Sequence, residues 1–360
     1  MKKVFRTSTL LIVAGVVVLA AMSVAIAGAS SSKKAAGGEV CVLFPDPATS
    51  IRWVHYDAPA MTASLKAAGV TYQIYNAGGD AQKQKAQADQ CLGNGAKVLV
   101  EVAIDAGSAA AIEKTAKAKG VPSIDYDRQV KGGVASIYVS FDGRAVGVLQ
   151  GKGIVAGLKA NGKYSQHPVI AEVNGGSTDA NSFLFKGGYD SILKPLYANG
   201  TFKKGPDQFV PGWDNQKAGT IFEQMLVKTG NKIDGVAAAN DGIANAVVVA
   251  LKAHKLKPIP LSGQDATSQG VQNIISGWQT MTVFKDVRLE AAAAAKAAVA
   301  IVKGTKLPQT GTIKTKGRSL EAAYLIVPQT ITKANYKVLF TSGFLKKKDV
   351  CNGTYAQYCK

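Results

Sequence analysis

Short apolar runs alternate with helix-like patterns along the chain from residue 39 onward. The apolar runs predict strands at 39–44, 70–75, 97–103, 122–126 and 135–141. The segments between them predict helices over 57–68, 80–92 and 108–119. A repeated strand–helix order predicts a parallel sheet whose crossover connections are right-handed.

The same rhythm restarts at a long predicted helix near residues 144–159. Further strands are expected at 168–173, 207–212, 234–239 and 259–263, and further helices at 179–195, 215–229 and 242–253. A strand at 281–284, an alanine-rich helix over 287–303 and a strand at 322–327 follow. The pattern therefore predicts an α/β fold with two similar Rossmann-like lobes, each a parallel sheet flanked by helices.

Chain length and composition agree with two lobes. The chain has 360 residues, and a single hydrophobic core rarely grows beyond about 250–300 residues. Hydrophobic residues make up 47% of the chain but aromatic residues only 7%, and there are 38 glycines. Small side chains of this kind allow helices and sheets to pack closely, as α/β layers require.

The N-terminus has the features of an export signal. Lys2, Lys3 and Arg6 precede an apolar run over 10–27, and small residues follow it. We expect a signal peptide over 1–29 and a flexible linker over 30–38. The apolar run is also just long enough to span a bilayer, so a retained anchor remains the alternative to cleavage. Both alternatives place the protein outside the cytoplasm, in the periplasm or on the outer face of the cell membrane.

The four cysteines fit an exported protein. Cys351 and Cys359 lie close together in a polar tail, and a small disulfide-closed loop is the natural interpretation. Cys41 lies in a predicted strand and Cys91 near a helix end, so they either pair with each other or stay buried free thiols. The sequence contains no CxxC motif and no His/Cys spacing typical of a metal site.

The formal net charge of +19 raises the question of a nucleic-acid partner. The positive charge is spread along the chain, with excess in the leader and in the basic tail 346–360. No helix-turn-helix, zinc or RNA-binding motif accompanies it. We therefore interpret it as a solvated basic surface and expect no nucleic-acid ligand.

Polar side chains stand where the predicted strands end, which is where open parallel sheets bind ligands. In the first half they are Arg52, Trp53, Asp127 and Arg128. In the second half they are Asp179, Asn181, Trp213, Asn240, Asp265 and Lys285. None of these candidates forms a nucleophile–base pair, and none is a histidine. We therefore expect a binding protein that is not an enzyme and needs neither cofactor nor metal.

The chemistry of this set suits a sugar. Sugar hydroxyls both donate and accept, so their site needs fixed acceptors, fixed donors and amides that do both. The flat indoles of Trp53 and Trp213 can cover the apolar faces of a sugar ring from opposite sides.

Structural roles would explain some of these residues equally well. Asp179, Asp241 and Asp286 each precede a predicted helix, where an aspartate often caps the N-terminus. Asp127 and Arg128 can form a structural ion pair, and Trp213 can fill the edge of a core. The segment 174–178, "NGGST", resembles a phosphate loop, but GxxxxGK[ST] and GxGxxG motifs are absent.

Several stretches resemble the type I periplasmic sugar-binding proteins of ABC transporters, and within them the D-xylose-binding branch. They are "IDYDR", "IYVSFDGRAVGVLQGKGI", "GGSTDANSFLFKGGYDSILKP", "VPGWDNQKAG", "NKIDGVAAANDGIANA", "SGQDA" and "QTMTVFK". The resemblance implies ligand contacts from all ten strand-end residues named above. The loop "LFPDPATSIRW" departs from the family pattern, and the calcium loop of the galactose-binding relatives is not seen.

The resemblance also implies an architecture and a role. The two lobes would be joined by three strands crossing a hinge near 141–143, 284–286 and 311–314. An N-terminal lobe would then contain 39–142 and 285–312, and a C-terminal lobe 143–284 and 313–345.

The implied function is that of a monomeric receptor that captures D-xylose or a similar aldose and delivers it to a membrane permease. Another sugar, a polyol or an autoinducer-like furanose is the alternative ligand. A repressor of the same core fold would need an N-terminal helix-turn-helix, and this chain has an apolar leader there.

Overall fold

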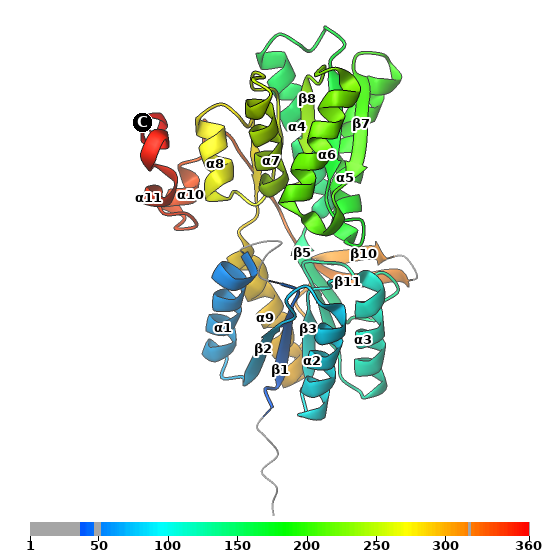
Figure 1. Ribbon diagram of the computed structural model, residues 1–360. Coiled ribbons are helices and arrows are strands. Elements are labelled where there is room, and N and C mark those ends of the chain that lie inside the picture. Colours follow the sequence, from blue (N-terminus) through cyan, green and yellow to red (C-terminus); the bar gives the residue numbers. More distant parts are fainter. Residues whose placement is uncertain (1–36, 47–51, 316–317, 360) are drawn as a thin grey trace, which may run out of the picture. The chain divides into compact units, whose positions relative to one another are not determined.

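The computed structural model describes residues 37–46, 52–315 and 318–359 (Figure 1). The predicted signal peptide and most of the predicted linker lie outside these residues. Within the described ranges, no helix combines the length and the apolar character that a membrane crossing requires.

The first lobe is built on a seven-stranded sheet in the order β10-β11-β5-β4-β3-β1-β2. Its strands are β1 (Val40–Phe44), β2 (Tyr72–Asn76), β3 (Val98–Glu101), β4 (Ser123–Tyr126), β5 (Ile137–Phe141), β10 (Gly311–Thr315) and β11 (Arg318–Ile326). Neighbouring strands are parallel except for the antiparallel pair β10–β11. The predicted parallel sheet is therefore confirmed, with an antiparallel hairpin added at one edge.

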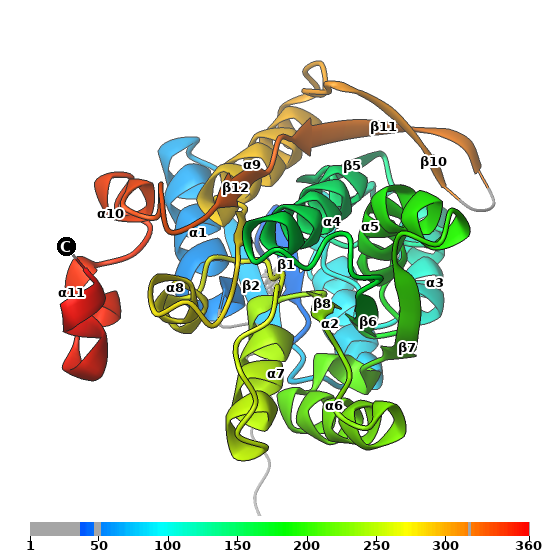
Figure 2. The same cartoon turned by 90° about the horizontal axis from the view of Figure 1, so that it is seen from above.

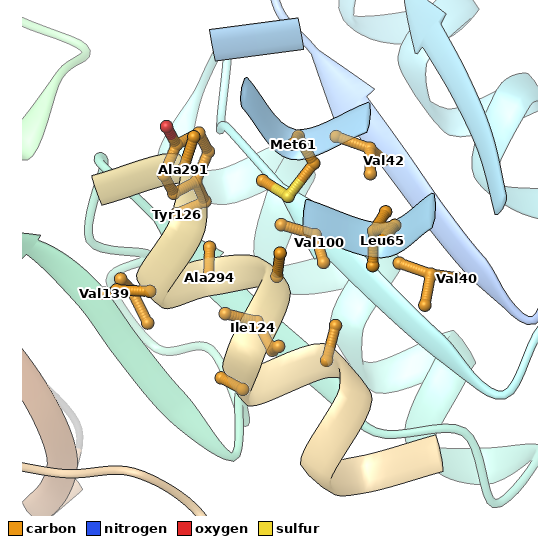
Figure 3. Packing of buried hydrophobic residues seen from close by; sticks show 14 of the residues in the cluster. Val40, Val42, Met61, Leu65, Val100, Ile124, Tyr126, Val139, Ala291 and Ala294 are labelled. Atoms are coloured by element: carbon orange, nitrogen blue, oxygen red, sulfur yellow. The ribbon is translucent and has the colours of Figure 1, made fainter. Parts of the chain in front are cut away.

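The two faces of this sheet are covered by different helices because side chains alternate along each strand. Val40, Val100, Ile124 and their same-face neighbours pack against α1 (Ala58–Ala67) and α9 (Val287–Lys303), as Figure 3 shows. The opposite face packs against α2 (Ala81–Gly93) and α3 (Ala106–Ala118). A π-helical turn, η1 (Trp53–Asp57), precedes α1.

The second lobe has a smaller parallel sheet in the order β7-β6-β8. Its strands are β6 (Val169–Asn174), β7 (Lys203–Phe209) and β8 (Gly235–Ala238). One face packs against α4 (Gly143–Ala160) and α5 (Ala180–Ala198), and the other against α6 (Asn215–Thr229) and α7 (Asp241–Ala253). The predicted strand at 259–263 is reduced to one bridge between Val236 and Leu261, and α8 (Ser268–Ile275) follows it.

Three connections join the lobes, and one differs from its expected place. The chain crosses at Asp142 between β5 and α4, and at 285–286 between β9 (Thr282–Phe284) and α9. The third crossing lies at 327–328, between β11 and β12 (Gln329–Ile331), and not at 311–314. Residues 313–326 therefore belong to the first lobe, because β10 and β11 form a hairpin that adds to the sheet beside β5 (Figure 2).

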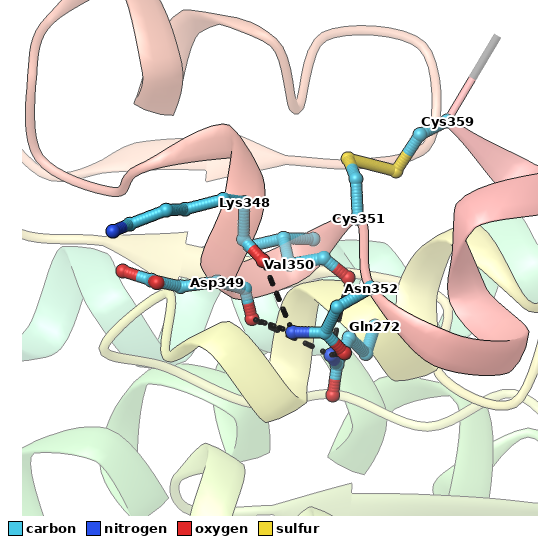
Figure 4. The surroundings of a disulfide bond; sticks show 7 residues. All are labelled: Gln272, Lys348, Asp349, Val350, Cys351, Asn352 and Cys359. Carbon is cyan, nitrogen blue, oxygen red and sulfur yellow. Dashed lines mark hydrogen bonds between the residues drawn. A yellow bond between two sulfur atoms is a disulfide. The ribbon is translucent and has the colours of Figure 1, made fainter.

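The C-terminal segment packs against both lobes near the hinge. It contains α10 (Val338–Thr341), α11 (Lys347–Val350) and the 3-10 turn η3 (Gly353–Tyr358). Gln272 of α8 donates to the carbonyl of Val350, 3.1 Å away, next to the disulfide Cys351–Cys359 (Figure 4). Phe344 stacks on Tyr56 of the first lobe with ring centroids 4.8 Å apart.

A second disulfide joins Cys41 of β1 to Cys91 of α2. Of the two alternatives for these cysteines, the structure therefore has the disulfide and not two free thiols.

Glycines let α4 and α5 approach closely. A Cβ atom at Gly147 would lie 1.9 Å from the carbonyl oxygen of Phe185, and one at Gly188 would lie 2.3 Å from that of Arg144. By contrast, a Cβ atom at Gly219 in α6 would meet no atom within 4 Å. The two helices can therefore be separated by adding one methyl group at their interface.

We expect Gly147→Ala to destabilise the protein by about 1–3 kcal/mol, because overpacking forces backbone shifts. The matched variant Gly219→Ala should stabilise it by about 0.5–1 kcal/mol, because alanine restricts the unfolded chain and favours the helix. Urea unfolding followed by circular dichroism measures both. Equal stability of the two variants would contradict the close packing of α4 and α5.

Buried carboxylates gather under α3 in the first lobe. Glu101 of β3 and Asp125 of β4 are register partners on adjacent strands, so their side chains share a face of the sheet. Glu113 of α3 lies over them and is also buried. Burial, reinforced by the charge of Glu113, raises the pKa of Glu101 and of Asp125 well above the usual range.

A carboxyl whose pKa is raised on folding stabilises the protein only while it is protonated. The contribution of Glu101 to the free energy of unfolding is therefore fully present below the pKa that Glu101 has in the unfolded chain. It is lost as the pH rises towards the higher pKa that Glu101 has in the folded protein. We expect Glu101→Gln to remove this loss, so that the variant gains stability relative to the wild type between pH 5 and pH 8. The exposed Glu223→Gln should leave the pH profile unchanged. Parallel profiles for wild type and Glu101→Gln in urea titrations at several pH values would count against a buried, protonated Glu101.

Candidate functional site

All ten strand-end candidates surround one cavity between the lobes. The cavity holds about 370 Å³ of empty space, part of it open to solvent. Its lining comprises Arg52, Trp53, Asp127, Arg128, Asp179, Asn181, Trp213, Asn240, Asp265 and Lys285, together with Phe185 and Gln264. The placement follows from topology, because these residues follow the carboxyl ends of strands or begin the next helix.

Arg52 anchors the first-lobe side of the cavity. Its Nη1 donates to Asp127 Oδ1 at 2.6 Å, and its Nε and Nη2 donate to the two carboxylate oxygens of Asp57 at 3.0 and 2.6 Å. Nη2 also donates to Glu290 Oε2 of α9 at 2.6 Å. Four of the five guanidinium N–H groups are thus engaged, and the second one on Nη1 has no acceptor among the residues that the structure describes.

This cluster has more acid than base, and protonation relieves the excess. Burial raises the pKa of Glu290 to about 8, against the attraction of Arg52. Glu290 is therefore mostly neutral at pH 7, so two carboxylates, Asp57 and Asp127, and not three face the single guanidinium. The Tyr126 hydroxyl donates a short hydrogen bond to Asp57, which fixes this carboxylate in turn.

Asp127 lies at the centre of a tight turn after β4. Its φ of 61° is left-handed, and the amide of Arg128 donates to the carbonyl of Tyr126 at 2.7 Å across it. The Asp127 carbonyl accepts from the side chains of Tyr138, Ser140 and Asn181, each at 3.0 Å. Burial alone would raise the pKa of Asp127, but Arg52, Lys285 and Arg128 outweigh it and lower the pKa. Asp127 is therefore an ionised acceptor.

A second contact between the lobes joins Arg128 and Asp179. Arg128 Nε lies 3.1 Å from Asp179 Oδ2, and its Nη1 donates to the carbonyl of Ala103 at 2.9 Å. Asp179 also caps α5 by accepting from the amide of Asn181 at 2.9 Å. Burial raises the pKa of Asp179, and Arg128 offsets part of this effect. Asp179 is therefore both the helix cap that the alternative interpretation proposed and part of the cavity wall.

The two indoles reach the cavity in different ways. Trp53 is only 2% exposed and lies beneath the guanidinium of Arg52, whose central carbon is 4.3 Å from the ring centroid. Trp213 is half-buried in a left-handed backbone conformation, and its Nε1 donates to Asp179 Oδ2 at 3.2 Å. Its ring lies over Gly175, where a Cβ atom would be 2.1 Å away. The glycines of "NGGST" therefore make room for this indole.

The remaining second-lobe residues add donors and acceptors. Asn240 caps α7 through its Oδ1, which accepts from Ile243 at 2.9 Å, and this leaves its Nδ2 outside the cap. Lys285 Nζ lies 3.5 Å from Asp265 Oδ1 and 5.8 Å from the centre of the Phe185 ring. Gln264 has a buried Oε1 with no hydrogen-bond partner among the described residues.

The charges around the cavity are balanced. Three carboxylates (Asp127, Asp179, Asp265) face three cations (Arg52, Arg128, Lys285). Such a wall offers strong hydrogen bonds of both polarities and no net charge, so it suits a neutral polar guest.

Structural roles do explain two of the other strand-end acids. Asp286 caps α9 and pairs with Arg288 at 2.7 Å. The cap interpretation of Asp241 is wrong, because Asn240 caps α7 and the Asp241 carboxylate instead accepts from the amide of Thr267 at 2.9 Å. Neither Asp286 nor Asp241 lines the cavity.

Sequence reasoning missed Asp57, Glu290 and Phe185, which lie inside helical segments and carry no strand-end signal. Gln264 adjoins Asp265 at the same strand end and is identified by the same rule.

Comparisons with known proteins agree with this architecture. A family model described as "Periplasmic binding protein domain" matches residues 42–306. The chain is 32% identical to the D-xylose-binding periplasmic protein of Escherichia coli (strain K12), covering 83% of this chain and 88% of that protein. It is also 32% identical to the multiple sugar-binding periplasmic receptor ChvE of Rhizobium radiobacter, with coverages of 86% and 91%.

A solved structure is also similar. The solute-binding protein of an ABC transporter from Clostridium phytofermentans, with bound β-D-glucose, superimposes with a TM-score of 0.80 and 31% identity. The match covers 86% of this chain and 99% of that one. With its two α/β lobes and three connections, the chain belongs to the periplasmic binding protein family and has the type I fold of that family.

Proposed function

We propose that the protein is an extracytoplasmic receptor that captures a neutral monosaccharide, D-xylose or a similar aldose, between its lobes. The observation that carries this proposal is the convergence of three carboxylates, three cations, three amides and two indoles on one cavity. Each strand-end residue serves as a hydrogen-bond partner or an apolar wall, and none as a base or nucleophile. D-xylose is supported by the name of the Escherichia coli relative.

Each group of residues has a defined task in this proposal. Asp127 and Asp265 accept from sugar hydroxyls, one from each lobe, while Arg128 and Lys285 donate to hydroxyls or to the ring oxygen. The second N–H on Arg52 Nη1 adds a donor. Trp213 covers one face of the ring, and Trp53 lies behind Arg52 on the other side.

Binding is coupled to closure of the lobes. Ligand contacts come from both sides of the hinge, so the closed form binds sugar better and its population rises when sugar is present. A membrane permease of the ABC type would recognise this closed form. Export through the leader is supported by the two disulfides, since such bonds persist in oxidising compartments.

D-glucose is the second candidate ligand. The solved structure from Clostridium phytofermentans is 31% identical to this chain and holds β-D-glucose. The two candidates differ by one hydroxymethyl group, and both are neutral aldoses.

Titration calorimetry with D-xylose, D-glucose, D-ribose and D-glucuronate tests the proposal. A neutral aldose should release heat and saturate at one sugar per protein. Negatively charged glucuronate should not bind, because the three cations of the cavity wall are already matched by three carboxylates. Absence of heat with every neutral sugar would reject the proposed function.

Two variants test the residues. Asp265→Asn should weaken binding about 10- to 100-fold, since a hydrogen bond to a charged group contributes about 1.5–3 kcal/mol. Trp213→Ala should weaken it about 10-fold or more through loss of the apolar wall. Asp214→Asn, which keeps the cap of α6, and Trp278→Ala, at the edge of the second-lobe core, serve as matched controls with unchanged affinity.

A further inference from the structure

A second and larger cavity adjoins the candidate site at the mouth of the cleft. It holds about 1530 Å³ of empty space, part of it open to solvent. Its first-lobe wall is the start of α3 and the loop 129–132, and its second-lobe wall is the segment 177–184. Asp179 lines both cavities, so the two spaces meet at this residue.

The mouth stays open although the lobes already touch further inside. Asn181 Nδ2 lies 3.0 Å from the Asp127 carbonyl, and Arg128 Nε lies 3.1 Å from Asp179 Oδ2. The outer cavity is therefore present in a form in which the two lobes are already in contact.

The outer cavity has an apolar platform. Phe183 of α5 is 54% exposed, although it is a large hydrophobic side chain. Its ring centroid lies 5.1 Å from that of Phe209, which supports it from behind. Ala180 and Leu184 extend the apolar wall, while Lys131, Ser177 and Thr178 supply polar groups around it. An aromatic face rimmed by donors and acceptors is suited to a sugar ring.

Arg128 lines the inner cavity and lies beside Asp179, which both cavities share. Arg128 is buried, and no described residue accepts a hydrogen bond from its Nε with suitable geometry, although Asp179 is close. Its guanidinium is nevertheless ion-paired with Asp179, so a charged donor and a charged acceptor meet where the two cavities adjoin.

We propose that the outer cavity is a subsite for a second sugar ring, so that the protein takes a neutral disaccharide as well as a monosaccharide. One ring occupies the inner cavity and the other lies against Phe183. This inference rests on the proposed function, because the inner ring uses the monosaccharide site.

Calorimetric titration of the exported protein with two matched pairs, D-xylose with xylobiose and D-glucose with cellobiose, tests this subsite. We expect the disaccharide of the bound monosaccharide to bind. Phe183→Ala should weaken the disaccharide about 10-fold, as loss of an aromatic platform implies, and the monosaccharide less than about 2-fold. Leu289→Ala, which removes an equally exposed apolar side chain from α9, should change neither.

The outcomes separate the two proposals. Binding of a monosaccharide without its disaccharide, or an equal loss of both in Phe183→Ala, overturns the outer subsite and leaves the proposed function standing. Failure of every sugar overturns the proposed function as well.

Discussion

One buried guanidinium determines how the first lobe presents its half of the site. Arg52 binds three acidic side chains that come from the π-helical turn, from the end of β4 and from α9. A buried charge is tolerated only when it is paired, so these three segments cannot drift apart without leaving a charge exposed to an apolar interior. The same contacts hold Trp53 under the guanidinium and orient Asp127 towards the second lobe. The site is therefore part of the structural core of the lobe and not an addition to its surface.

The connections between the lobes lie next to this half-site and carry further contacts. Three connections lie side by side, and the amide of Asp142 in the first donates to Ile326 near the third at 3.0 Å. The C-terminal segment lies against the same region: Phe344 contacts Tyr56 of the first lobe and Phe284 of β9, and α11 rests on α8. The disulfide at 351 and 359 closes the end of this segment. Relative motion of the lobes must therefore involve these aromatic contacts as well as the three strands.

Much of the fold and of the site could be predicted from the sequence. The strand–helix alternation is strongly periodic, and parallel sheets bring their carboxyl ends to one edge, so residues such as Asp127 and Trp213 were found without coordinates. Residues that reach the site from within helices could not be predicted in this way. Glu290, for example, follows no strand and reaches Arg52 only through tertiary packing. The hairpin β10–β11 was misplaced since its apolar run looks the same in either lobe. Strand β7 was shifted because Lys203 and Gly205 hide the alternation of an edge strand.

The central claim is that acceptors and donors of both lobes meet on one neutral sugar. A crystal structure of the protein grown with D-xylose tests it most directly. The account predicts one pyranose in the inner cavity, hydrogen-bonded to Asp127 from the first lobe and Asp265 from the second, with its ring against Trp213. A sugar bound elsewhere on the protein, or touching only one lobe while the inner cavity holds solvent, would contradict the account.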